Sequence, residues 1–178
     1  LGTGASLSIN NQQLTINGAV TGNGTLSGSA TSDLVIGGAA GSVAFTSGSR
    51  VLRNLTLNTN ASLTLATALT ITGGSNAGAL TVNSGATLSS NGNLTLASDG
   101  NGTATVANST GTITGNVTAQ RFLPARSTRK NLFLASPVTA QINNAWQQQI
   151  HITGTGSGGT ICPTLTPHTN GFDATLNN

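Results

Sequence analysis

The chain is poor in charged and aromatic residues, and it contains no Glu, Tyr or Met. Of its 178 residues, 5% are charged and 3% are aromatic, whereas an ordinary globular domain is about 25% charged. A coiled coil or helical bundle needs Glu, Lys, Arg and Leu in quantity, so this composition excludes both. A chain that is disordered because of charge repulsion is excluded as well, because the net charge is only +3 and hydrophobic residues make up 36%.

Basic residues are also scarce, although the isoelectric point is about 10.6. Six basic side chains stand against three acidic ones, and residues 1–49 contain no Arg or Lys. A nucleic-acid-binding protein needs a dense basic face, so we expect no nucleic-acid partner. No stretch approaches the roughly 18 apolar residues of a membrane-spanning helix, so we expect no membrane span. Glycine has no three-residue period, which excludes collagen.

Cysteine occurs once, at Cys162, so no internal disulfide can form. This pattern suits an exported protein that does without disulfides. No signal peptide is visible, and Leu1 is not an initiator residue. Because residues 1–9 already have the pattern of a repeat, we expect a processed protein or a fragment of a longer one.

Small residues dominate what is present: Gly, Ser, Thr and Asn account for 92 of the 178 positions. Up to about residue 119, polar and apolar residues alternate in runs of three to five, which is the pattern of half-buried β-strands. Gly, Asn and Ser separate the runs, and these residues tolerate turn conformations. The predicted strands are residues 5–9, 13–18, 25–27, 33–37, 43–45, 55–58, 62–65, 69–71, 80–83, 87–89, 94–96, 103–106 and 112–114.

The runs recur at a regular interval. Leu-X-Ile or Leu-Thr-Leu begins at residues 14, 34 and 55, in steps of 20 and 21 residues. A coil of about 20 residues with two or three short strands is typical of a β-solenoid. We therefore predict an all-β protein whose residues 1–118 form a parallel β-solenoid, or β-helix. Asn17, Asn58 and Asn83 at repeated corners would form a side-chain ladder.

An antiparallel β-sandwich is the alternative fold, since it also has many short strands and Gly-rich turns. Its hairpins are more evenly spaced, and its core usually contains aromatic residues. Residues 1–119 contain one aromatic residue, Phe45, and no proline. The lack of proline favours continuous stacking, because proline breaks ladder hydrogen bonds.

Residues 119–178 have a different composition, with all four prolines, the only Trp, both His and four of the six basic residues. Residues 120–124 and 131–135 have the pattern of two strands joined by a polar connection. Residues 141–152 fit a short helical turn, and residues 153–160 a Gly-rich loop. A solenoid leaves an open apolar end that has to be covered. We therefore predict that residues 119–178 form a β-rich capping or linker region that continues beyond the chain.

Two parts of the chain resemble known secreted proteins. Residues 1–118 resemble the parallel β-helix repeats of autotransporter passengers and filamentous-haemagglutinin-like adhesins. Residues 115–173 resemble a segment of large secreted Bacteroidota proteins, through the sequences GNVTAQRFLPA, NLFLASPV, WQ and NGFD. Those proteins commonly carry solenoid repeats before this segment and end in a type IX secretion sorting domain. The resemblance implies export to the cell surface, although no sorting domain is visible here.

The acidic residues do not form a catalytic pair. Asp33, Asp99 and Asp173 are the only ones. Glycosidases need two carboxylates about 5 to 10 Å apart, and a calcium site needs six to eight oxygens. Asp33 and Asp99 are about three coils apart, or roughly 14 Å at about 4.8 Å per coil. We interpret the aspartates as turn residues and predict no catalytic residue.

The other candidate sites lie in the C-terminal region. His151, Cys162 and His168 have no zinc-ligand spacing and no sign of a nucleophile pair, so we predict neither a metal nor a cofactor. The Gly-rich stretch at residues 154–159 lacks the Lys-Ser/Thr of a phosphate loop. A small basic cluster is a candidate contact for an anionic glycan or lipopolysaccharide, although a solvated turn is the simpler interpretation; it consists of Arg126, Arg129 and Lys130.

Threonines form rows that should face outward, since each lies between apolar neighbours. A flat array of this kind would suit ice or sugar hydroxyls, and β-propensity combined with solubility also explains it. Ice-binding faces usually repeat Thr-X-Thr, whereas here Thr, Ser and Asn mix. The rows comprise Thr15, Thr56, Thr64, Thr70, Thr81 and Thr95.

These patterns favour a non-enzymatic structural stalk or adhesin module of a secreted or cell-surface bacterial protein. Its expected partners are surface glycans, other cell-surface proteins or secretion-machinery proteins. The alternatives are a carbohydrate- or surface-binding face on the solenoid and, third, a polysaccharide-degrading β-helix enzyme.

Overall fold

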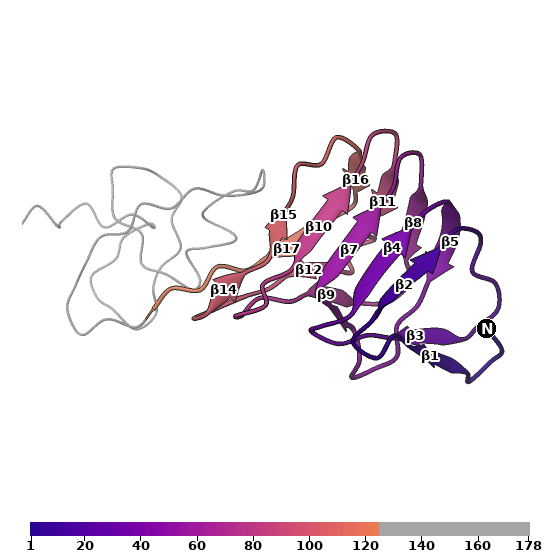
Figure 1. The fold of residues 1–178 in the computed structure, drawn as a ribbon, viewed down its shortest axis with the longest axis horizontal. Coiled ribbons are helices and arrows are strands. Elements are labelled where there is room, and N and C mark those ends of the chain that lie inside the picture. Colours follow the sequence, from indigo (N-terminus) through magenta and orange to yellow (C-terminus); the bar gives the residue numbers. More distant parts are fainter. Residues whose placement is uncertain (125–178) are drawn as a thin grey trace, which may run out of the picture. The chain divides into compact units, whose positions relative to one another are not determined.

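The structure, a computed structural model, describes residues 1–124, which lie within a compact unit spanning Leu1–Ser127. This part of the chain is all-β (Figure 1). It forms a parallel β-solenoid of about five turns, as the alternation and the repeat predicted. The antiparallel sandwich is therefore wrong. The predicted capping region lies outside the described residues, apart from residues 119–124.

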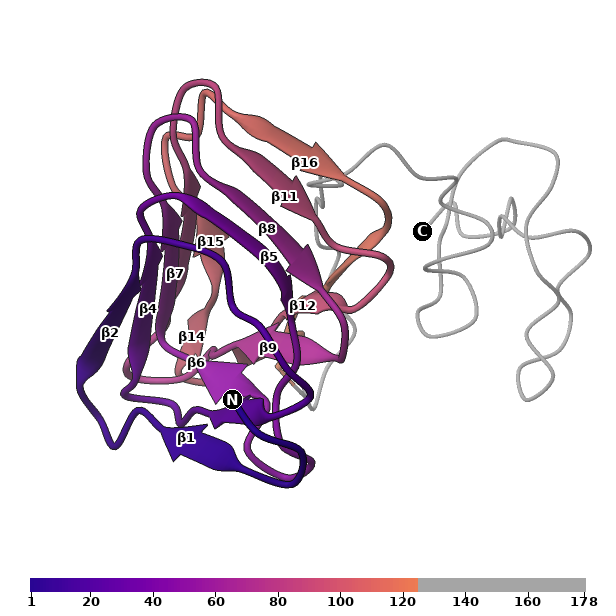
Figure 2. The same ribbon diagram turned by 90° about the vertical axis from the view of Figure 1, so that its right-hand side faces the viewer.

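Three sheets enclose the core (Figures 1 and 2). The first sheet contains β2 (Gln13–Ile16), β4 (Asp33–Ile36), β7 (Asn54–Leu57), β10 (Ala79–Val82) and β15 (Thr105–Val106). The second contains β5 (Ala39–Val43), β8 (Ser62–Leu65), β11 (Thr87–Ser89) and β16 (Thr112–Thr114). The third contains β6 (Val51–Leu52), β9 (Leu69–Ile71), β12 (Leu94–Leu96) and β17 (Val117–Ala119).

Two smaller pairs complete the described strands. β1 (Ser6–Ser8) pairs in parallel with β3 (Thr25–Ser27), and a further bridge joins Leu26 to Phe45. β13 (Ser98–Asp99) and β14 (Gly102–Thr103) form a hairpin, which is the one antiparallel pair within residues 1–124. Every other pairing joins one coil to the next coil in the stack.

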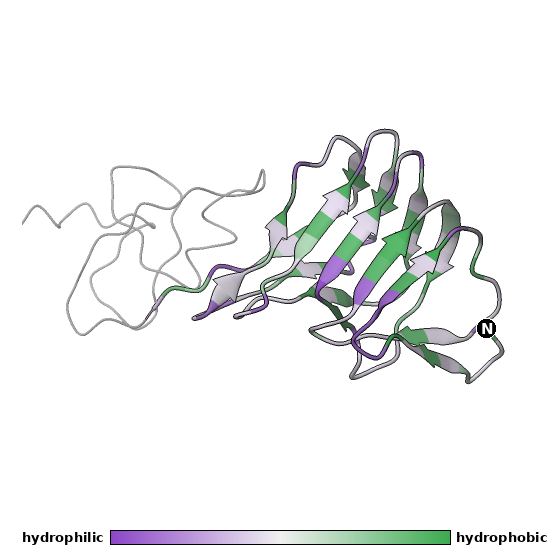
Figure 3. Cartoon of the chain, viewed as in Figure 1, coloured by the Kyte–Doolittle hydropathy of each residue, from purple (hydrophilic) through white to green (hydrophobic). Residues whose placement is uncertain are grey.

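Apolar residues stack in register inside the solenoid. The innermost column of the first sheet steps from residue 14 to 34, 34 to 55, 55 to 80 and 80 to 106, so the coils advance by 20, 21, 25 and 26 residues. Figure 3 shows the resulting alternation of apolar and polar positions along the strands. Full burial of one large aliphatic side chain contributes about 1.5–3 kcal/mol, and the column makes that gain in the three coils where its residue is 0% exposed, at Leu34, Leu55 and Leu80. Its members are Leu14, Leu34, Leu55, Leu80 and Val106.

The longer coils arise at one corner, where the chain passes from the third sheet to the first. Between β6 and β7 this corner is Arg53 alone, whereas residues 72–78 and then residues 97–104 fill it in the next two coils. The two longer corners stack, and Gly74 N donates to Gly102 O at 3.2 Å. The added length therefore lies outside the core, and the strands that flank these corners pair with the neighbouring coils without a register shift.

Close packing at the corners depends on glycine at specific positions. A Cβ atom on the buried Gly78 would overlap the carbonyl oxygen of Arg53 in the preceding coil. At another corner Asn60 and Gly85 stack on each other with φ of 61° and 71°. This left-handed conformation is the one that Gly and Asn adopt most readily.

The expected asparagine ladder is not present in the described residues. Gly37 separates Asn17 from Asn58 in this column, and no hydrogen bond joins the side chains of Asn58 and Asn83. The ladder prediction was wrong because a ladder needs asparagine at the same corner of successive coils, and Gly37 occupies that corner in the coil between Asn17 and Asn58.

Candidate functional site

The outer surface of the solenoid is built from hydroxyl-bearing side chains. The predicted outward threonines are half-buried or exposed, and those from Thr56 onward lie between buried neighbours. The first sheet carries one outward column of threonines, interrupted by Val35, and the third sheet carries one that begins with Val51 and continues with threonines. Their members are Thr15, Val35, Thr56 and Thr81 in the first sheet, and Val51, Thr70, Thr95 and Thr118 in the third.

The second sheet differs because it carries two hydroxyl columns side by side. Each of β8, β11 and β16 has the pattern hydroxyl, aliphatic, hydroxyl, and the parallel register aligns the three strands. Adjacent strands are about 4.8 Å apart and alternate residues about 6.6 Å apart. We name this set the hydroxyl face; it consists of Ser62, Thr64, Thr87, Ser89, Thr112 and Thr114.

The hydroxyl face is uncharged, since β5, β8, β11 and β16 contain no Asp, Glu, Lys or Arg. Thr114 Oγ1 donates to Ser89 Oγ at 3.2 Å, which links two members across adjacent strands. A neutral, regularly spaced array of donors and acceptors can bond to other hydroxyl groups or to water. It has no group that would attract a charged ligand.

The main polar cluster of the first sheet is an ion pair between two coils. Arg53 Nε donates to Asp33 Oδ1 at 2.9 Å, and Arg53 Nη2 donates to Asp33 Oδ2 at 2.5 Å. These two hydrogen bonds lower the pKa of Asp33, and the charge of Arg53 and the hydrogen bonds from Asn54 lower it further, against the opposing effect of partial burial. The Asp33 side chain is only 17% exposed. The carboxylate is therefore held as a structural partner of Arg53.

Asn54 continues this cluster to the next coil. Its side-chain Nδ2 donates to Asp33 Oδ1 at 3.0 Å, and its Oδ1 accepts the backbone N–H of Ala79 at 3.0 Å. Side-chain hydrogen bonds thus link three successive strands, β4, β7 and β10. A polar ladder does exist, but it lies at the start of these strands, four positions before the corner asparagines that were expected to form it.

Asp99 has a local structural role in the β13–β14 hairpin. Its Oδ1 accepts the backbone N–H groups of Asn101 at 2.8 Å and Gly102 at 3.1 Å. This geometry is an Asx turn, which supports the expected turn role for this aspartate. The rungs that begin at Asp33 and Thr105 are three steps apart in the first sheet, or about 14 Å. Asp33 is held by Arg53, whereas Asp99 is held by the backbone N–H groups of its own turn.

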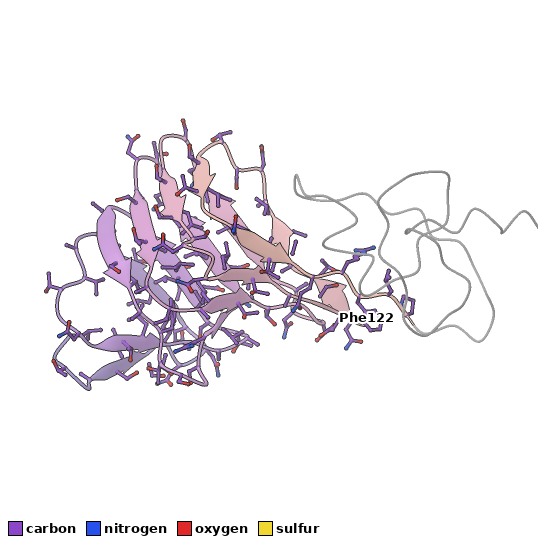
Figure 4. The ribbon with its side chains drawn as sticks, turned by 180° about the vertical axis from the view of Figure 1, so that it is seen from behind. Phe122 is labelled. Atoms are coloured by element: carbon purple, nitrogen blue, oxygen red, sulfur yellow. The ribbon has the colours of Figure 1, made fainter. Side chains whose placement is uncertain are left out.

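Phe122 is the exposed aromatic residue of the described chain, with 44% of its surface accessible, whereas Phe45 is buried in the core. Its ring lies against the hairpin, 3.4 Å from where a Cβ would stand on Gly100, and its N–H donates to Ser98 Oγ at 3.0 Å (Figure 4). Gln120 Oε1 also accepts the Ser98 N–H at 3.3 Å. These contacts fix the segment after β17 to the hairpin.

Most of the other predicted candidates lie outside the described residues. These are Asp173, the basic cluster Arg126, Arg129 and Lys130, the residues His151, Cys162 and His168, and the Gly-rich loop. Their predictions remain predictions. Among residues 1–124, no helix is long and apolar enough to cross a membrane.

Sequence reasoning missed the double column of the hydroxyl face. It identified Thr64 but not its in-register neighbours, because it listed threonines that lie between apolar residues and did not align them, or the serines, by strand register. The signal was the repeated hydroxyl, aliphatic, hydroxyl triplet at Ser62, Thr87 and Thr112, in steps of 25 residues from 62 to 87 and from 87 to 112.

Comparison with known proteins gives no relative for this chain: no family model, no curated protein and no solved structure matches it significantly.

Proposed function

We propose that the chain is a non-enzymatic structural module, a β-solenoid stalk or spacer of a secreted or surface-attached bacterial protein. The observation that carries this proposal is the column of aliphatic residues in register from Leu14 to Val106, of which Leu34, Leu55 and Leu80 are fully buried. Backbone hydrogen bonds between coils run along the same axis. A stack of this kind gives rigid reach and needs no site chemistry.

The composition supports the same role. Charged side chains are few, and Asp33 and Arg53 neutralise each other between coils. Small residues at the corners allow close stacking, as at Gly78. The likeness of residues 1–118 to bacterial β-helix repeats, and of residues 115–173 to secreted Bacteroidota proteins, points to export, by type IX secretion, to the cell surface. Other cell-surface or secretion-machinery proteins are its proposed partners.

A distance measurement across the stack tests the rigid spacer. Spin labels at Gln13→Cys and Thr105→Cys, in a Cys162→Ser background, report a separation of four coils, about 19 Å. Duplicating residues 54–78 adds one coil and should lengthen the separation to about 24 Å, with a distribution that stays narrow. A broad distribution, or no lengthening, would argue against a rigid spacer.

The second candidate is an adhesin that binds neutral carbohydrate, and the observation that favours it is the hydroxyl face. Its uncharged, regular array fits a ligand that offers many hydroxyl groups and no charge. A glycan array separates the two candidates. Binding that is lost when Thr87 and Thr112 are replaced by Val supports the adhesin, whereas signal at background level supports the spacer alone.

A polysaccharide-degrading enzyme is the weakest of the three functions. Asp33 is bound to Arg53, and Asp99 is bound to the backbone of its own turn. Neither carboxylate has the acid or base partner that glycoside hydrolysis requires. Release of reducing sugars from a panel of polysaccharides by the purified chain would contradict a non-enzymatic role.

A further inference from the structure

Four Asn-Gly pairs occur within residues 1–124, at 17–18, 23–24, 91–92 and 101–102. In such a pair the glycine backbone nitrogen can attack the asparagine side-chain carbonyl carbon, Cγ. A new C–N bond forms, the side-chain nitrogen leaves as ammonia with the glycine proton, and a cyclic succinimide results. Water then opens the ring to aspartate or isoaspartate. The reaction needs a glycine N–H that is not held by a hydrogen bond.

Three of the four glycine N–H groups are held. Gly24 N donates to Leu1 O at 3.1 Å, Gly102 N donates to Asp99 Oδ1 at 3.1 Å, and Gly92 N donates to Ser90 Oγ at 3.4 Å. The Asn91 side chain is held as well, through Nδ2 to Leu65 O at 3.4 Å. Attack at these three pairs therefore has to break a hydrogen bond first.

Gly18 is different, because no acceptor for its N–H lies among residues 1–124. It follows the end of β2, where the ladder to the next coil closes with Gly37 N donating to Ile16 O at 2.8 Å. No atom lies within 4 Å of the position that a Cβ would take on Gly18. Both Asn17 and Gly18 are exposed, and the Asn17 Oδ1 lies against Gly37 of the next coil, where no hydrogen bond within residues 1–124 holds it.

From this contrast we infer that Asn17 is a modification site, the main position of spontaneous deamidation in residues 1–124. The product places a carboxylate at the end of β2, where residues 1–32 otherwise carry no charged side chain, and lowers the formal net charge from +3 to +2. The isoaspartate form also adds one carbon to the backbone at the point where β2 meets the corner. The modification therefore changes both charge and chain geometry on the first coil.

A time course on the full chain tests this inference. The native protein is incubated in mildly alkaline buffer containing ¹⁸O water, and fragment-ion mass spectra assign the labelled sites. Asn17 should convert about fivefold faster than Asn23 or Asn101, the factor that corresponds to about 1 kcal/mol of barrier. In urea the four rates should converge, because the dipeptide is the same at each site. Equal rates in the native protein, or a faster rate at another site, would overturn the inference.

Gly18→Ala is the matched variant, since the open space around Gly18 accommodates a methyl group. The added Cβ hinders the attacking nitrogen, so conversion at Asn17 should be lost while the melting temperature and the rates at the other three pairs stay unchanged. Conversion at Asn17 that continues unchanged in this variant would show that the reaction does not use the Gly18 nitrogen, and would also overturn the inference.

Discussion

Arg53 donates hydrogen bonds of 2.9 and 2.5 Å to the two carboxylate oxygens of Asp33, which lies one coil earlier in the stack. Asp33 and Asn54 occupy the same column of the first sheet, so the pair spans the step from β4 to β7. The Arg53 side chain is 42% exposed, and exposed pairs usually contribute about 0–1 kcal/mol. The Asp33–Arg53 pair therefore adds little to the free energy of unfolding, and its main effect is to align the coil of β4 with the coil of β7.

The Asp33–Arg53 pair predicts a defined pH dependence. Because Arg53 lowers the folded-state pKa of Asp33, the stabilisation is complete above the ordinary value of 3.8 and is lost as the pH falls through the lower folded-state value. Asp33→Asn should remove this acid-sensitive contribution, at most about 1 kcal/mol, in urea unfolding followed at several pH values. Arg53→Gln should have the same effect, and the double variant should add little. Fully additive losses would contradict the coupling.

The in-register core predicts a strong contrast between neighbouring positions in β7. Leu55 is fully buried and Thr56 faces outward. Leu55→Ala should cost about 2–5 kcal/mol, and Leu55→Asp should abolish folding because it buries an unpaired charge. Thr56→Ser is the control and should change the melting temperature little. Similar effects at both positions would show that the inward and outward assignments are wrong.

Glycine substitutions test the corner packing. Gly78→Ala should destabilise strongly, because the new methyl group meets the Arg53 carbonyl oxygen, which is backbone and cannot rotate away. Gly18→Ala places the same methyl group in open space and serves as the control. Thermal melts of both variants make the comparison, and an unchanged melting temperature for Gly78→Ala would contradict the close stacking of these coils.

Protease resistance follows from the same backbone pairing. Residues 1–124 contain three trypsin sites, at Arg50, Arg53 and Arg121. Thr70 N donates to Arg50 O, and Arg53 N donates to Ser32 O, each at 2.8 Å. Cleavage after Arg50 and Arg53 requires local unfolding of the stack, so it should be slow in the native chain and fast in urea. Rapid native cleavage at either site would contradict this protection.

Much of the fold could be predicted from the alternating runs. The leucines at 14, 34 and 55 that set the apparent repeat prove to be stacked neighbours. The later coils are longer because residues 72–78 and 97–104 extend a corner. The 20-residue repeat read from the first three leucines could not predict these insertions. The shortest strands, such as β6, and the bulged β5 were missed because pairing with adjacent coils, rather than their own alternation, makes them strands.

The candidate sites were harder to predict, since they depend on which residues the register aligns. The turn role of Asp99 follows from its neighbours in the sequence, Asn101 and Gly102. The partnership of Asp33 with Arg53 joins residues 20 positions apart and depends on a single-residue corner. The hydroxyl face likewise exists only because three strands share one register.

Nuclear Overhauser contacts between strand backbones test the central claim most directly. The solenoid predicts that β7 contacts β4 on one side and β10 on the other, with Leu55 aligned with both Leu34 and Leu80 and all three strands parallel. A pattern in which β7 pairs antiparallel with the next strand along the chain, β8, would contradict the stacked coils and, with them, the spacer function.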